Sequence, residues 1–213
     1  MRVSSTFISG AVAAVAVAGS AIAGVVDPFT TAQAFSTSSG YLPISGALFT
    51  ERSGGLIGGS ASGSIDGSGN LNFTVTSGSF NIVSLGYQMS GGATNDLSSI
   101  AAMSIALSGL NKSGAATGIT FVFSMADEND NFLTSNEALS ANGVSTFNFA
   151  SATVDGGFDL TKVKTMTLEI GYFPGGAGSS SGTLSNFNYT LVPAPGALAL
   201  LGAAGLVGSR RRR

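Results

Sequence analysis

Apolar and polar residues alternate with a period of two in several stretches of this chain, as expected for strands that bury one face. The alternation is clearest in LNFTVT, ITFVFSM, TMTLEIGY and FNYTL, which are residues 71–76, 119–125, 165–172 and 187–191. Gly, Ser, Asn and Asp separate these runs, and such residues favour turns. The pattern therefore predicts a series of strands, with no long amphipathic helix.

Three further segments need interpretation. In FNIVSLGYQM, residues 80–89, the apolar positions change parity, which predicts a β-bulge near Val83. IAAMSIALSGL, residues 100–110, mixes helix formers with alternation, and we expect a strand. The Gly-rich stretch 54–70 lacks a phosphate-binding motif and predicts a mobile hairpin or surface loop. Six to nine strands at this spacing predict an all-β fold, an antiparallel β-sandwich of jelly-roll type over residues 24–190.

Composition narrows the possible chemistry. Only 9% of the 213 residues are charged and 31 are Gly, but 44% are hydrophobic and 14 are Phe, which favours a folded domain over disorder. The absence of Cys excludes disulfides, thiol nucleophiles and thiolate metal sites, and the absence of His excludes Ser-His-Asp hydrolysis. Carboxylate-based glycoside hydrolysis remains open.

Charge is unevenly placed along the chain. All eleven acidic residues lie between Asp27 and Glu169, where only four basic residues occur, giving this region a net charge of −7. Nucleic-acid binding requires a basic patch that neutralises phosphates. We therefore expect no nucleic-acid partner.

Residues 1–23 have the features of a secretory signal peptide. A basic Arg2 precedes an apolar stretch, and Ala21 and Ala23 give the small-x-small pattern that signal peptidase accepts. This predicts cleavage after Ala23 and export of the protein. The alternative is a transmembrane anchor or a buried helix.

Residues 191–213 combine a Pro-x-Pro motif, an uncharged apolar run and a basic end. The motif is Val192-Pro193-Ala194-Pro195-Gly196, and the chain ends with Arg210, Arg211, Arg212 and Arg213. A helix over the 14 residues from Pro195 to Gly208 would span about 21 Å, short for a hydrocarbon core of about 30 Å. The arginines would act as a cytoplasmic stop.

This arrangement resembles the PEP-CTERM-type sorting signal of exosortase substrates, with Ala194 in place of the name-giving Glu. The resemblance covers about the last 22 residues. It implies an exosortase-type membrane protease as partner, transient anchoring in the inner membrane and release to the cell surface or extracellular matrix. It also implies a Gram-negative-type bacterium that makes exopolysaccharide. The alternative is a plain C-terminal tail anchor.

The region between the two ends resembles carbohydrate-binding-module-like jelly rolls. The resemblance rests on VDPFTTAQAF, FVFSMADENDNF, FDLTKVKTMTLEI and GTLSNFNYTL, residues 26–35, 121–132, 158–170 and 182–191. In the last segment, Ser185-Asn186 stands where the family often carries Asp-Asn, and this departure argues against a structural Ca²⁺ ligand at that position, if the family uses one there.

Asp127, Asn129 and Asn131 are candidates for a Ca²⁺ site because their spacing is that of the start of a Ca²⁺ loop. Phe132 and Ala138 occupy positions where an EF-hand needs Gly and Glu, so a solvated hairpin turn is favoured. No carboxylate pair for catalysis can be chosen among Asp96, Glu137, Asp155 and Glu169. Tyr41, Tyr87 and Tyr172 could stack on sugar rings, although alternation favours core positions for the last two.

These observations favour an exported, non-catalytic surface or matrix protein with a structural or adhesive role, and they assign no cofactor and no metal. The alternative is a carbohydrate-binding module for the cell's own exopolysaccharide. A third hypothesis is a glycan-active enzyme.

Overall fold

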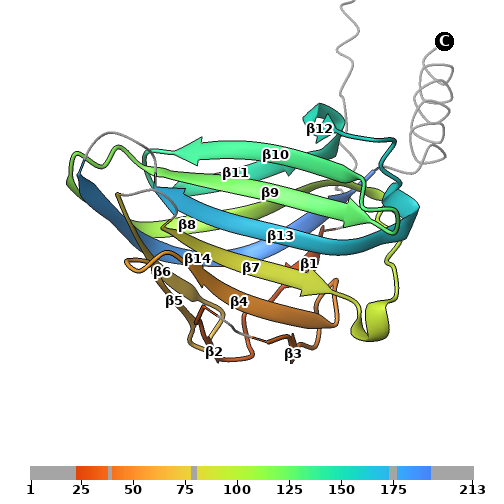
Figure 1. Ribbon diagram of the computed structural model, residues 1–213, viewed down its shortest axis with the longest axis horizontal. Coiled ribbons are helices and arrows are strands. Elements are labelled where there is room, and N and C mark those ends of the chain that lie inside the picture. Colours follow the sequence, from red (N-terminus) through yellow and green to blue (C-terminus); the bar gives the residue numbers. More distant parts are fainter. Residues whose placement is uncertain (1–22, 38–39, 78–80, 173–176, 193–213) are drawn as a thin grey trace, which may run out of the picture. The chain divides into compact units, whose positions relative to one another are not determined.

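The computed structural model describes residues 23–37, 40–77, 81–172 and 177–192, and these form two β-sheets. All pairings between the named strands are antiparallel. Figure 1 shows the sheets as two layers, one with β10, β9, β13, β7 and β4 and the other with β11, β8, β14 and β6. The prediction of an all-β antiparallel sandwich is confirmed.

The first sheet has β14 at its centre. Its strand order is β11 (Gly143–Asn148), β8 (Ile100–Gly114), β14 (Gly178–Leu191), β6 (Leu71–Thr76), β5 (Ser62–Ile65) and β2 (Gln33–Ala34). β1 (Ala23–Asp27) pairs with the C-terminal part of β14, from Ala23–Thr190 to Asp27–Phe187. The expected strand at 100–110 is therefore present and extends to Gly114.

The second sheet has β13 at its centre. Its strand order is β12 (Thr153–Val154), β10 (Phe132–Leu139), β9 (Ile119–Asp127), β13 (Val163–Tyr172), β7 (Ile82–Gln88), β4 (Glu51–Ile57) and β3 (Leu42–Pro43). Consecutive strands often belong to opposite sheets, as β8–β9 and β13–β14 do. Three short 3-10 turns lie in the connections: η1 (Ser90–Gly92), η2 (Phe149–Ser151) and η3 (Leu160–Lys162).

The core lies between the sheets and is built from the alternating positions. Leu71, Phe73 and Val75 are buried on β6. The alternating positions of β9 and β13 are buried as well: Ile119, Phe121, Phe123, Met125, Met166, Leu168 and Ile170. Phe123 of β9 stacks on Phe147 of β11 with ring centroids 5.0 Å apart, so aromatic packing joins the two sheets. Burial of each such side chain contributes roughly 1.5–3 kcal/mol.

The predicted bulge near Val83 is wrong. β7 begins at Ile82 and pairs with β4 and β13 without a register shift, with Val83, Leu85 and Tyr87 facing inward. The change of parity arises because Ile82, at the start of the strand, lies on the outer face and is half-buried. Phe80 lies outside the described residues.

The Gly-rich stretch 54–70 is not a mobile hairpin or a plain surface loop. It contains most of β4 and all of β5, which belong to different sheets. Gly54 and Gly63 face the ring of Phe35, and a Cβ on Gly63 would lie 2.6 Å from Phe35 Cδ2. These glycines therefore make room for a buried aromatic ring, a packing role that Gly content does not reveal.

The expected signal helix and C-terminal transmembrane helix fall at residues 1–22 and 193–213, outside the described residues. Within residues 23–37, 40–77, 81–172 and 177–192, no helix is long and apolar enough to cross a membrane.

Candidate functional site

The turn between β9 and β10 is organised by the carboxylate of Asp127. Its Oδ1 accepts hydrogen bonds from the backbone N–H groups of Asn129 (2.8 Å) and Asn131 (3.0 Å). Its Oδ2 accepts from Asn131 Nδ2 (3.1 Å) and from the Asp159 N–H (3.0 Å). The predicted hairpin turn is therefore present, although Asp127 itself is buried rather than solvated.

These bonds also bear on the Ca²⁺ hypothesis. Four donors occupy the oxygens of Asp127 that a cation would need, and Asn131 donates its amide to the same carboxylate. Burial raises the pKa of the Asp127 carboxyl, but the hydrogen bonds from Asn131, Asp159 and Asn129 outweigh it and hold that pKa below its usual range. Among the described residues, no three acidic side chains converge as metal ligands.

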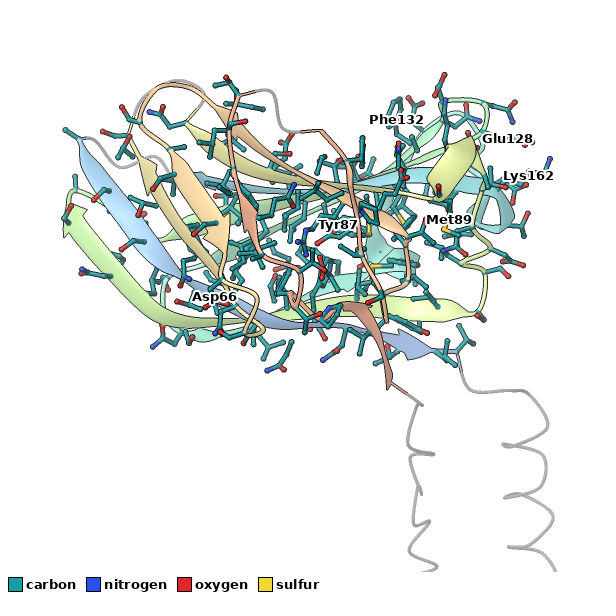
Figure 2. The ribbon with its side chains drawn as sticks, turned by 90° about the horizontal axis from the view of Figure 1, so that it is seen from below. Asp66, Tyr87, Met89, Glu128, Phe132 and Lys162 are labelled. Atoms are coloured by element: carbon teal, nitrogen blue, oxygen red, sulfur yellow. The ribbon has the colours of Figure 1, made fainter. Side chains whose placement is uncertain are left out.

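The tyrosines considered for sugar stacking differ in their exposure to solvent. Tyr87 is fully buried between the sheets, as Figure 2 shows, and Phe49 and Phe187 pack around its ring. Tyr41 precedes β3 and is 41% exposed. Tyr172 ends β13, and its side chain lies outside the described set. Of the two candidates whose side chains are described, Tyr41 is the one exposed enough to stack on a ligand.

Tyr41 reaches over the outer face of the second sheet. A Cβ added to Gly86 of β7 would lie 3.2 Å from Tyr41 Oη and 2.7 Å from Ser53 Oγ. Leu85 and Tyr87 point inward, so this space at Gly86 is on the outer side. The missing side chain at Gly86 allows the Tyr41 hydroxyl to extend from the edge of the sheet toward its centre.

Small residues, most of them polar, form two central rows of this face. The flanking rows also carry apolar side chains, among them Phe132, Ile57 and Ile82. The strand register aligns one row across β4, β7, β13, β9 and β10: Ser53, Gly86, Thr167, Ser124 and Thr134. The next row along the strands is Gly55, Ser84, Glu169, Val122 and Asn136. From β4 to β10 the row crosses four strand spacings of about 4.8 Å, or about 19 Å. We call this surface, together with Tyr41, the polar face.

The carboxylates singled out in the sequence do not lie close to one another in the structure. Asp96 and Asp155 are exposed in loops, and Glu137 lies opposite Phe121 on the inward side of β10. Glu169 is on the polar face, as is Glu51, whose Oε2 accepts from Gln88 Nε2 at 2.7 Å. The register separates Glu51 and Glu169 by two strands and four residues, about 17 Å between Cα atoms. The two carboxyl groups of a glycosidase lie roughly 5–10 Å apart. The Glu51 carboxylate bonds Gln88 in its own row rather than extending toward Glu169, so these residues are not arranged as a catalytic pair.

A second feature is a cleft of about 460 Å³ on the first sheet. Its walls come from β1, from β14 and from the turn between β5 and β6. Its lining includes Pro28, Ser68, Asn70, Ser185, Asn186 and Asn188. Ser185-Asn186, singled out in the sequence in connection with a Ca²⁺ ligand, thus lies in a cleft whose lining is mainly neutral and polar. We call it the amide cleft.

Sequence reasoning missed a buried charge network behind this cleft. Arg52 Nη1 of β4 bonds Asp27 Oδ2 of β1 at 2.7 Å, and both side chains are buried. Arg52 also donates to Gln33 Oε1 and to the Thr31 carbonyl, and Tyr87 Oη donates to Asp27 Oδ2 at 3.1 Å. The signal that could have revealed this network is Arg52 itself. It is the only basic residue between Arg2 and Lys112, and it lies within a strand-like segment.

The residues at the two predicted processing points lie mostly outside the described part of the chain. Ala21, Pro193, Ala194, Pro195, Gly196 and Arg210, Arg211, Arg212 and Arg213 are outside it. Ala23 is the first residue of β1 and pairs with Thr190. Val192 is 53% exposed, and its N–H donates to the Ser99 carbonyl at 2.8 Å.

The described residues form an antiparallel two-sheet β-sandwich whose second sheet carries rows of small polar residues on its outer face. No protein-family model matches the chain, and a search of curated proteins finds no match. Solved structures with a similar fold include the family 11 carbohydrate-binding module of a cellulosomal cellulase from Clostridium thermocellum, at 13% identity and a TM-score of 0.39, covering 73% of this chain and 96% of that one.

Two other solved structures are also similar in fold. A family 30 carbohydrate-binding module has 11% identity and a TM-score of 0.42, with 80% of this chain and 99% of that chain covered. An agarase has 15% identity and a TM-score of 0.46, with 73% of this chain matched to 25% of that chain. At these identities and TM-scores, the likenesses say nothing about what this chain binds.

Proposed function

We propose that this protein is an exported, non-catalytic β-sandwich that binds carbohydrate on its polar face. The observation that carries the proposal is the position of Tyr41, a partly exposed aromatic residue whose hydroxyl reaches over Gly86 beside Ser53. An aromatic face packs against the C–H groups of a sugar ring, and nearby hydroxyl and amide groups bond its hydroxyls.

The neighbouring residues suit a neutral glycan. Ser53, Thr167 and Ser124 offer hydroxyl groups in the row that passes Tyr41, and Gln88 and Asn136 offer amides in flanking rows. Hydroxyls and amides both donate and accept hydrogen bonds, as sugar hydroxyls do. The carboxylates of Glu51 and Glu169 disfavour an anionic polymer on this face.

Export and sorting belong to the same proposal and rest on the two chain ends. The signal-peptide features and the Pro-x-Pro, apolar and arginine arrangement support secretion, transient inner-membrane anchoring and exosortase processing near residues 192–196. Exopolysaccharide of the producing cell is then the natural glycan, and a matrix role follows from binding it. Mass spectrometry of the surface-associated protein tests the sorting step. An intact C-terminus through Arg213 would contradict it and leave a tail anchor.

The glycan-binding proposal is tested by titrating the full chain, in a detergent without a sugar headgroup, with cellohexaose, laminarihexaose and mannohexaose. We expect at least one of these neutral probes to bind, and Tyr41→Ala to weaken that binding by about 30-fold, the effect of a typical hot-spot residue of about 2 kcal/mol.

Two matched variants sharpen the test. Tyr41→Phe keeps the ring and should retain most of the affinity. Val144→Ala removes an exposed apolar side chain from β11 of the other sheet and should change nothing. Equal binding by wild type and Tyr41→Ala would exclude the polar face as the site. Hydrolysis of any probe would instead favour the enzyme hypothesis.

A further inference from the structure

The amide cleft and the polar face belong to opposite sheets, so the proposed glycan site does not use the cleft. The cleft exists because two neighbouring strands both carry an extra residue. On β14 the pairing with β8 jumps from Ser185–Ala106 to Asn188–Ser104, and on β1 the pairing with β14 shifts between Val25 and Asp27. Two adjacent bulges open the sheet surface at one place.

The bulge on β14 changes which side chains face outward. In a regular strand Asn186 and Asn188 would share one side and Ser185 and Phe187 the other. Here Asn186 adopts a left-handed φ of 52°, and Phe187 is fully buried. Ser185, Asn186 and Asn188 consequently all line the cleft, which concentrates polar groups that a regular strand would divide between core and solvent.

The opposite wall is a fixed turn. Asp66 Oδ1 accepts the Ser68 N–H at 2.8 Å, and Asp66 Oδ2 accepts Asn70 Nδ2 at 3.3 Å. The Gly69 N–H bonds the Phe29 carbonyl at 3.3 Å, which ties the turn to the segment after β1. Figure 2 shows Asp66 in this turn, at the surface of the molecule. Hydrogen bonds from Ser68 hold the pKa of the Asp66 carboxyl below its usual range, because the donors of this turn stabilise the charged carboxylate.

The lining chemistry selects for a neutral ligand. The carboxylate of Asp27 is already bonded by Arg52, Tyr87 and the Phe29 N–H, so its charge is satisfied inside the protein. No Lys or Arg is among the lining residues of the cleft, so nothing there attracts a phosphate or a uronate. No hydrogen bond within the described residues occupies the side-chain amides of Asn186 and Asn188.

We propose that the amide cleft is a second saccharide site that holds one neutral hexose residue between these amides and Pro28. Its volume of about 460 Å³ is within the range of small-ligand sites. This inference rests on the proposed function and extends it. With sites on opposite sheets the protein is bivalent, and a bivalent module links separate polysaccharide chains rather than coating one.

The experiment uses the Tyr41→Ala full chain, in which the polar face is disabled, titrated with the same three hexasaccharides. We expect one equivalent of at least one probe to bind. Adding Asn186→Gly and Asn188→Ala should weaken that binding at least tenfold. Glycine at 186 accepts the left-handed backbone, so the first change removes the amide without disturbing the bulge.

Asn148→Ala is the matched control, because Asn148 is an exposed amide on β11 of the same sheet, outside the cleft lining. Melting curves that agree among the variants exclude misfolding as the cause of any loss. No binding to Tyr41→Ala, or binding that the two cleft substitutions leave unchanged, overturns the second site and leaves the polar-face proposal intact. Binding of Ca²⁺ in the cleft without any saccharide overturns it as well.

A second readout tests bivalency. Wild type mixed with a long soluble glucan or mannan should raise its viscosity, whereas Tyr41→Ala and Asn186→Gly/Asn188→Ala should each fail to do so. Equal viscosity with wild type and either variant would contradict cross-linking through two sites.

Discussion

Two buried aspartates in this protein are stabilised in opposite ways. Asp27 is paired with a charged side chain, Arg52, from the other sheet, and with the phenol of Tyr87, 60 residues away in sequence. Asp127 is bonded chiefly by backbone N–H groups and one amide, three of its four bonds coming from residues within four positions of it. The first carboxylate joins the sheets, and the second shapes one turn.

The comparison shows that burial alone does not define the role of a charge. Asp27 depends on the guanidinium of Arg52, and removing that group would leave an unpaired charge in the core. The loss of either partner should therefore remove the stabilisation of the whole network. Asp127 is bonded by four separate donors, so the loss of one leaves three in place. Mutations should therefore have large and coupled effects around Asp27, and smaller, pH-dependent effects around Asp127.

The largest effect is expected for Arg52→Met. Losing the guanidinium leaves Asp27 buried without its charge partner, and we expect a loss of about 3–5 kcal/mol in the free energy of unfolding. Urea denaturation of the full chain measures it. The double variant Asp27→Asn/Arg52→Met should recover part of the loss. Lys164→Met, which breaks the exposed pair with Asp130, should cost about 1 kcal/mol or less. Equal losses for Arg52→Met and Lys164→Met would refute the network.

Tyr87→Phe comes next. The substitution keeps the ring packed against Phe49 and Phe187 but removes the 3.1 Å bond to Asp27. A hydrogen bond to a charged group is worth about 1.5–3 kcal/mol, and we expect a loss in that range. Tyr41→Phe makes the same change at a partly exposed position and should remain within about 0.5 kcal/mol of wild type. A loss as small as that of Tyr41→Phe would show that the Tyr87 hydroxyl does not support Asp27.

Asp127→Asn tests the turn through pH. Because hydrogen bonds lower the pKa of Asp127 in the folded state, its stabilisation is present above the unfolded value, near 3.8, and is lost as pH falls through the folded pKa. The free-energy difference between wild type and Asp127→Asn should therefore shrink as pH falls below about 4. Urea titrations from pH 7 to pH 2.5 measure this difference.

The control for the pH series is Asn129→Ala, in the same turn, which removes no titrating group. Its effect on stability should stay constant over the range. A difference between wild type and Asp127→Asn that is constant or grows toward low pH would mean that the carboxylate does not gain its stability from these bonds.

The smallest effect is expected for Ca²⁺. The oxygens of Asp127 are occupied by four donors, so millimolar Ca²⁺ should leave the melting temperature of the full chain unchanged. A rise that a chelator reverses and that Asp127→Ala abolishes would make the turn a metal site after all.

The sequence determined the fold class because strand periodicity is local. The alternation in 71–76 and 119–125 identifies inward residues without knowledge of the neighbouring strands, and these residues form the core. The hairpin at Asp127 was also predictable, since three of its four hydrogen bonds come from residues within four positions. The prediction of a bulge near Val83 was wrong because the alternation was followed across the start of a strand. The prediction of a loop at 54–70 was wrong because Gly54 and Gly63 make room for the ring of Phe35, which is distant in sequence.

Only the tertiary structure decided where the chemistry lies. Strand order brings Arg52 to Asp27, sets the Tyr41 hydroxyl over Gly86, and places the β1 and β14 bulges side by side. Each of these contacts joins residues separated by 25 to more than 150 positions, and their meeting depends on which strands pair and in which register. Sequence periodicity fixes the face on which a side chain stands, but not the strand beside it, and therefore not the site.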